Sequence, residues 1–82
     1  MINKNTPQNH DFYLALFRAG VPLKDEWGPV ECSQATNAWL HDSGAEDLEA
    51  VFQALKDFEK STPDISSELK NAITLIRGEH AA

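Results

Sequence analysis

Proline and glycine residues divide this chain into four segments, and each segment carries apolar residues at helical spacing. Proline favours the first turn of a helix, whereas glycine favours the position just after its end. This pattern predicts four helices, at about residues 7–19, 29–42, 44–60 and 63–77. No segment shows the sustained alternation of apolar and polar residues that a half-buried strand has. We therefore expect an all-α fold, a small four-helix bundle with orthogonal or up-down packing, as one domain over residues 1–82.

Local signals mark where these helices begin and end. Thr6 precedes Pro7 and can cap the first helix, and Gly20 provides a left-handed stop after it. Residues 43–46 read Ser-Gly-Ala-Glu, which fits the capping box of the third helix. Thr62–Pro63 repeats the Thr-Pro opening, and we expect Gly78 to end the fourth helix.

The first helix has the broadest apolar face. Its apolar residues cover about 200° of the circumference, against about 100° for an ordinary surface helix. These residues are Phe12, Tyr13, Leu14, Leu16 and Phe17. A face this wide predicts either a helix packed among the other three or a helix that also forms a homodimer. In the second helix, the expected buried stripe is Cys32, Ala35 and Trp39.

Charge is distributed unevenly along the chain. Residues 25–55 contain no lysine or arginine but hold seven acids, so this stretch sums to about −7 and the remainder to about +1. Both tryptophans lie in the same stretch, and tryptophan is enriched among residues that anchor protein interfaces. The pattern predicts a partner protein with a basic surface. The residues expected to contact it are Asp25, Glu26, Trp27, Glu31, Asp42, Glu46, Asp47 and Glu49.

Catalysis and cofactor binding find little support in the sequence. Cys32 is the only cysteine, and His41 would lie about 180° around the same helix and ~13 Å along it, so the two cannot form a nucleophile and base pair. No zinc, calcium or phosphate-binding motif is present. We therefore expect no enzyme activity, no metal and no cofactor. A net charge of −6 also disfavours direct binding of nucleic acid.

Residues 44–58 loosely resemble the start of the second helix in acyl carrier proteins, which are also small, acidic and four-helical. In that family a serine carries phosphopantetheine at the position that Asp47 occupies here. The resemblance therefore implies a similar helix and no carrier function.

A single cysteine and a polar N-terminal segment bear on the compartment. One cysteine cannot form an intrachain disulfide, residues 1–10 lack an apolar signal core, and no run approaches the ~18 apolar residues that span a bilayer. We expect a cytoplasmic protein that does not bind membranes.

Two functions follow from these observations. The first is a small acidic protein-binding domain that regulates or inhibits a partner, by occluding a basic nucleic-acid-binding surface as phage-type inhibitors do. The alternative is a structural or accessory subunit, or a homodimeric assembly module, that uses the apolar face of the first helix.

Overall fold

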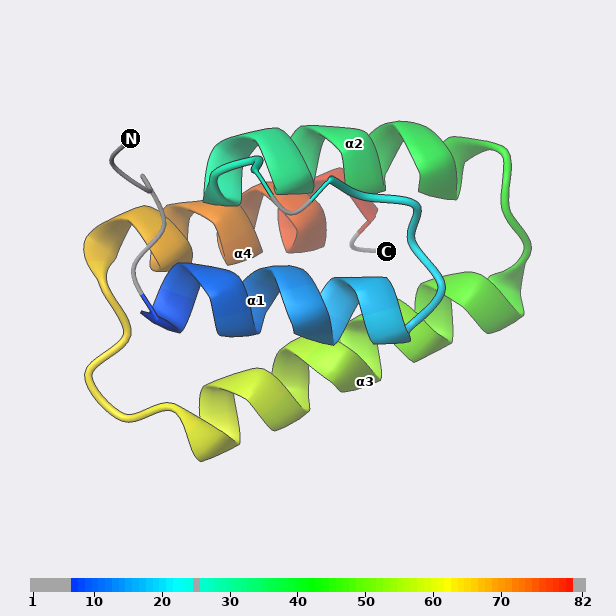
Figure 1. The fold of residues 1–82 in the computed structure, drawn as a ribbon. Helices are drawn as coiled ribbons and strands as arrows, with labels where there is room; N and C mark the ends of the chain where they lie inside the picture. The colour runs from blue at the N-terminus through cyan, green and yellow to red at the C-terminus, as the bar shows by residue number, and fades with distance from the viewer. Residues whose placement is uncertain (1–6, 25, 81–82) are drawn as a thin grey trace.

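Four helices form a small bundle in the computed structural model, which describes residues 7–24 and 26–80 (Figure 1). The elements are α1 (Pro7–Arg18), α2 (Pro29–His41), α3 (Ala45–Ser61) and α4 (Ser67–His80). The described residues contain no strand, and the predicted all-α four-helix bundle is confirmed. Thr6, the expected cap of α1, and Asp25 lie outside the described residues.

Helices α2 and α4 lie side by side and run in the same direction. Three polar contacts join them in register: Ser33 Oγ donates to the Ala72 carbonyl at 2.9 Å, Asn37 Nδ2 donates to the Leu75 carbonyl at 3.2 Å, and His41 Nε2 lies 3.1 Å from Glu79 Oε2. The residue numbers rise together along both helices, so the pair is parallel. Figure 1 also shows α1 beginning on the same side, with α3 running back at an angle to it. Since the consecutive helices α1 and α2 run in the same direction in Figure 1, the expected up-down packing is wrong.

The core is built from one face of each helix. Phe12 and Leu16 of α1 are fully buried, and the Phe12 ring meets Phe58 of α3 edge-on at 5.5 Å between ring centroids. Other residues of this core are Val21, Leu23, Cys32, Leu40, Val51, Leu55, Leu69, Ala72, Ile73 and Ile76. Phe17, in contrast, is 49% exposed. The central part of the wide apolar face of α1 therefore lies in the core, and the edges of that face remain at the surface.

Two buried residues of α2 are polar. Ser33 and Thr36 have no exposed surface, and both hydroxyls are satisfied, since Thr36 Oγ1 donates to the Cys32 carbonyl at 2.7 Å. Of the expected stripe, Cys32 is buried, whereas Ala35 and Trp39 are only partly buried. The most deeply buried face of α2 therefore carries Ser33 and Thr36. The small side chains of these two residues allow α4 to pack closely against α2.

The N-terminus of α4 differs from the prediction by four residues. Residues 62–66 form a turn in which Asp64 has a positive φ of 57°, a conformation that ends the helical path. Gln8 holds this turn, because its side chain donates to the Asp64 carbonyl at 3.1 Å and accepts from the Ser66 amide at 3.2 Å. Ser66 then caps α4 by accepting from the Leu69 amide at 3.3 Å. At the other end α4 continues through Gly78, so the expected stop there is wrong.

The predicted capping box of α3 is also wrong. Ser43 closes α2 instead, because its hydroxyl donates to the Trp39 carbonyl at 2.8 Å and its amide donates to the Leu40 carbonyl at 3.2 Å. Gly44 takes the N-cap position of α3 without a side-chain bond. The Gly20 stop is confirmed: its φ is +110°, and the Val21 amide bonds the Leu16 carbonyl at 3.2 Å.

Candidate protein-binding surface

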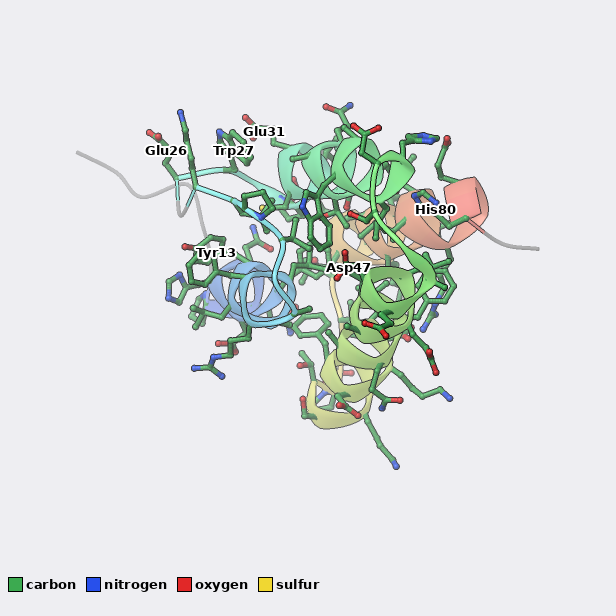
Figure 2. The ribbon with its side chains drawn as sticks, turned by 90° about the vertical axis from the view of Figure 1, so that its right-hand side faces the viewer. Tyr13, Glu26, Trp27, Glu31, Asp47 and His80 are labelled. Atoms are coloured by element: carbon green, nitrogen blue, oxygen red, sulfur yellow. The ribbon has the colours of Figure 1, made fainter. Side chains whose placement is uncertain are left out.

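The acidic residues expected to form one surface lie at two ends of α2. Glu26 and Glu31 are exposed beside its first turn, whereas Asp42 follows its last turn. Asp42 lies eleven positions after Glu31, which corresponds to about 16 Å along the helix axis. Figure 2 shows Glu26 and Glu31 together at one edge and Asp47 apart from them. Only a partner spanning the length of α2 would touch both groups.

The acids at the α2–α3 turn have a structural explanation. Glu46 and Asp47 occupy the first turn of α3, where the helix dipole stabilises carboxylates. Asp47 is half-buried, and Glu49 is exposed on the next turn. Within residues 7–24 and 26–80, no group of three or more His, Cys, Asp or Glu side chains is arranged to hold a metal ion. The helix dipole therefore accounts for the positions of Glu46 and Asp47 without a ligand.

Aromatic side chains line the outer flank of α1. Tyr13 and Phe17 stack at 5.6 Å between ring centroids, and His10 lies 5.8 Å from Tyr13 on the same flank. Phe17 does not contribute its full area to the core, because half of its surface meets solvent. Burying an aromatic ring of this kind is worth several times the energy of a surface polar contact, so an exposed stack suits an interface.

Trp27 lies in the loop just before α2. Its side chain is partly buried against the core, its amide donates to the Lys24 carbonyl at 3.1 Å, and Lys24 Nζ lies 5.8 Å from its ring centroid. In Figure 2, Tyr13, Glu26 and Trp27 are on the same side of the molecule, with Glu31 beside Trp27. We call this surface the aromatic–acidic face, and it consists of Tyr13, Phe17, Glu26, Trp27 and Glu31. The sequence identified its acids and Trp27 but not Tyr13 and Phe17, which were assigned to the general apolar face of the helix.

Trp39 has a packing role. It is partly buried against the core, and a Cβ atom added at Gly20 would lie 3.8 Å from its Cη2 atom. The indole therefore covers the turn at the end of α1. This agrees with its expected place beside Cys32 and Ala35.

Cys32 is the one buried thiol in the described part of the chain. Its side chain is 1% exposed, and its Sγ lies 3.9 Å from the Trp27 carbonyl oxygen. Burial, with a smaller contribution from the negative charge of Glu31, raises the pKa of the thiol from 9.0 to about 11. A thiol with this pKa holds its proton at neutral pH and is a poor nucleophile.

This raised pKa predicts a loss of stability in alkaline solution. Between pH 9.0 and about 11 the unfolded chain releases the Cys32 proton while the folded chain retains it, so stability falls as the pH rises. Two pH units correspond to roughly 2–3 kcal/mol. We expect urea unfolding to show this loss in the wild type beyond that of Cys32→Ala, which lacks the thiol. Parallel losses in the two proteins would contradict the prediction.

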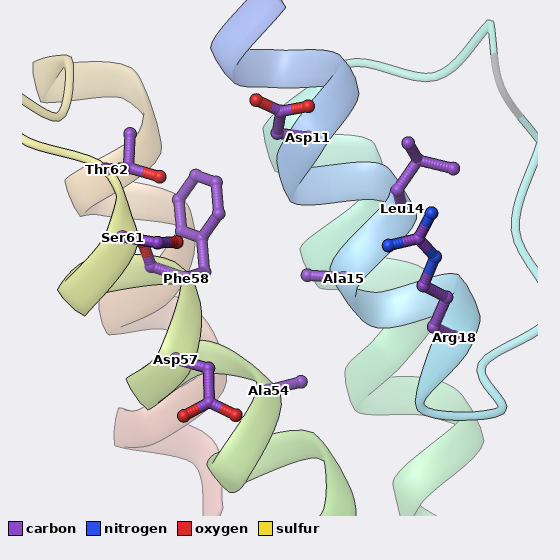
Figure 3. Close-up of a pocket in the computed structure, with 9 residues that line it drawn as sticks. All are labelled: Asp11, Leu14, Ala15, Arg18, Ala54, Asp57, Phe58, Ser61 and Thr62. Carbon is purple, nitrogen blue, oxygen red and sulfur yellow. The ribbon is translucent and has the colours of Figure 1, made fainter.

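An open groove of about 420 Å³ runs between α1 and α3 (Figure 3). Its apolar lining comes from Leu14 and Ala15 of α1 and from Ala54 and Phe58 of α3. Its charged lining residues are Asp11, Arg18 and Asp57. This groove lies on the flank of α1 opposite to Tyr13 and Phe17, as their helical positions require.

The remaining observations concern membrane-spanning helices and similarity to known proteins. No helix in residues 7–24 or 26–80 is long and apolar enough to cross a membrane. No protein-family model matches the chain, and comparison with curated proteins and with solved structures found no match either.

Proposed function

We propose that this chain is a small protein-binding domain that contacts a basic partner through its aromatic–acidic face. The observation that carries the proposal is the exposed Phe17 ring, stacked on Tyr13 and left outside the core. Aromatic anchors surrounded by polar residues are the usual composition of interface hot spots. Trp27 adds a third ring on the same side of the molecule.

The charges of this face indicate the chemistry of the partner. Glu26 and Glu31 are exposed beside Trp27, and residues 26–55 contain no lysine or arginine. Lys24 Nζ lies 5.8 Å from the Trp27 ring centroid, and a lysine or arginine of the partner would make the same kind of cation–π contact with an aromatic ring of this face. A partner that presents arginine or lysine around an apolar centre would match the face in both polarity and charge. Covering such a basic surface is how the domain would regulate or inhibit the partner.

The test is capture of binding proteins from extracts of cells that express the chain, compared between variants. Wild-type protein and Phe17→Ala, Glu26→Lys and Glu49→Lys variants would each be immobilised and their retained proteins quantified by mass spectrometry. We expect a partner that the wild type and Glu49→Lys retain and that the other two variants lose. Glu49 provides the matched control, because it is an exposed acid outside the face.

A salt series separates the proposed function from an accessory subunit held by apolar contacts. Raising the salt from about 0.1 M to about 1 M shortens the Debye length from ~10 Å to ~3 Å, which weakens contacts between exposed charges. Release by salt supports binding through Glu26 and Glu31. A partner that resists salt and depends only on Phe17 would favour the accessory subunit. If no retained protein depends on Phe17 or Glu26, the proposed function is wrong.

A further inference from the structure

One face of α1 lines the groove between α1 and α3. The charges on this face complement those on a second copy of the same face that runs in the opposite direction. Asp11, Leu14, Ala15 and Arg18 follow the i, i+3, i+4, i+7 spacing of one helix face. All four line the groove shown in Figure 3. Asp11 and Arg18 lie at equal distances from the midpoint between Leu14 and Ala15. When two copies of this helix lie antiparallel about that midpoint, each Asp11 therefore faces the Arg18 of the other copy.

We propose that the chain forms a symmetric homodimer in which α1 packs antiparallel against α1 of a second copy over this groove. A two-fold interface requires a self-complementary patch, in which residue i of one copy meets residue j of the other and j meets i. The pair Asp11 and Arg18 meets this requirement with opposite charges. The two residues are about 10.5 Å apart along their own helix, too far to pair with each other.

The charged groups are available for such contacts. Asp11 and Arg18 are both exposed, and among the described residues the ion pairs are His41 with Glu79 and Arg77 with Glu59. Asp11 lines the groove together with Ser61 at the end of α3. An Arg18 from the second copy placed there would also meet the negative end of the α3 dipole, which favours a cation.

The apolar part of the patch fits the same arrangement. Leu14 is half-buried within one copy, although it lies on the far side of α1 from Phe12 and Leu16. Ala15 and Ala54 are small, so they leave the groove open to a side chain from outside. In the dimer, Leu14 of each copy lies beside Ala15 of the other and enters this space.

The area involved sets the strength of association. A stable interface buries about 1,200–2,000 Å², whereas one face of a three-turn helix with part of α3 offers less. We therefore expect a weak dimer with a dissociation constant on the order of 100 µM. The aromatic–acidic face lies on the other flank of α1 and stays exposed in both copies. Failure of the dimer would leave the proposed function unaffected, and the reverse also holds.

Sedimentation equilibrium of charge-reversed variants tests the proposal, from about 10 µM to about 1 mM protein, which brackets that affinity. We expect the wild type to dimerise and Asp11→Arg and Arg18→Asp each to dissociate at least tenfold more readily, because two ion pairs become two repulsions. An equimolar mixture of the two variants should form a heterodimer, since every facing pair is again opposite in charge. Glu49→Arg, a reversal outside the groove, should behave as the wild type.

Each of these measurements either supports or overturns the proposed homodimer. The doubly reversed Asp11→Arg/Arg18→Asp chain should dimerise by itself, and circular dichroism of all variants checks that the helices are intact. The proposal would be overturned by a wild-type mass that remains monomeric throughout, by single reversals that dimerise as strongly as the wild type, or by variants that fail to restore association on mixing.

Discussion

Replacing Phe12 with alanine is expected to lower the free energy of unfolding by about 3–5 kcal/mol. The ring is fully buried at the crossing of α1 and α3 and meets Phe58 edge-on at 5.5 Å. Its removal takes away the transfer energy of the ring and leaves a cavity that the neighbouring side chains fill only in part. Domains of this size have a total stability of roughly 5–15 kcal/mol, so the variant loses a large share. Urea unfolding followed by far-ultraviolet circular dichroism measures the change.

The matched control for this substitution lies five residues along the same helix. Phe17→Ala removes the same ring, but Phe17 is 49% exposed and outside the core. We expect its cost to be about 1 kcal/mol or less, mainly from the lost stack on Tyr13 at 5.6 Å. Equal costs for the two substitutions would show that the apolar face of α1 is buried evenly, contrary to the structure.

Helix identity could be predicted from the sequence because the signals for it are local. Gly20 ends α1 through a positive φ that glycine adopts freely, and Pro29 occupies the first position of α2. Both depend on the conformation of the residue itself and on its immediate neighbours. Three of the four predicted helices accordingly begin and end within one residue of the observed bounds.

The start of α4 could not be predicted because its turn is fixed by a residue far away in the sequence. Gln8 bonds both Asp64 and Ser66, across 56 and 58 positions. The Thr-Pro signal at residues 62 and 63 is the same local pattern that precedes α1, yet here it lies in the turn. A contact between residues this far apart in the sequence leaves no local pattern from which it could be predicted.

The candidate surface was predicted in composition but not in geometry. The absence of lysine and arginine from residues 25–55 identified the acids, yet that stretch contains the whole of α2. A straight helix keeps its two ends apart, so Glu31 and Glu46 cannot belong to one compact site. Phe17 was missed because periodicity places it on the apolar face of α1, and only the packing of α2 and α3 decides how much of that face is covered.

The buried face of α2 illustrates the same limit. A search for apolar residues at helical spacing treats serine and threonine as polar. Ser33 and Thr36, which are fully buried, were therefore not predicted to lie in the core. Each hydroxyl finds a backbone carbonyl, Ser33 on the neighbouring helix and Thr36 on its own. Burial of these two residues thus depends on the partner helix and on the hydrogen bonds, which a single-helix pattern does not contain.

Replacing Ser33 with leucine is expected to lower the free energy of unfolding by about 3 kcal/mol. Ser33 has no exposed surface, and its Oγ lies 2.9 Å from the carbonyl oxygen of Ala72, which is itself fully buried. A leucine side chain has three more carbon atoms than serine. These atoms would clash with the α4 backbone unless the two helices moved apart. Because α2 packs more extensively on α4 than on α1, separating them disturbs the largest helix contact of the bundle.

Two controls distinguish crowding from the lost hydrogen bond. Ser33→Ala removes the bond without adding volume and should cost about 1 kcal/mol. Gln34→Leu introduces the same side chain at the next position, which is exposed, and should change the stability by less than about 0.5 kcal/mol. If urea unfolding gives equal losses for Ser33→Leu and Ser33→Ala, then the helices tolerate a wider spacing and the hydrogen bond alone accounts for the serine. A much larger loss for leucine would mean that the small side chain itself sets the distance at which α2 and α4 can run parallel. It would then also set the position of Glu31 in the first turn of α2 and of Trp27 just before that helix.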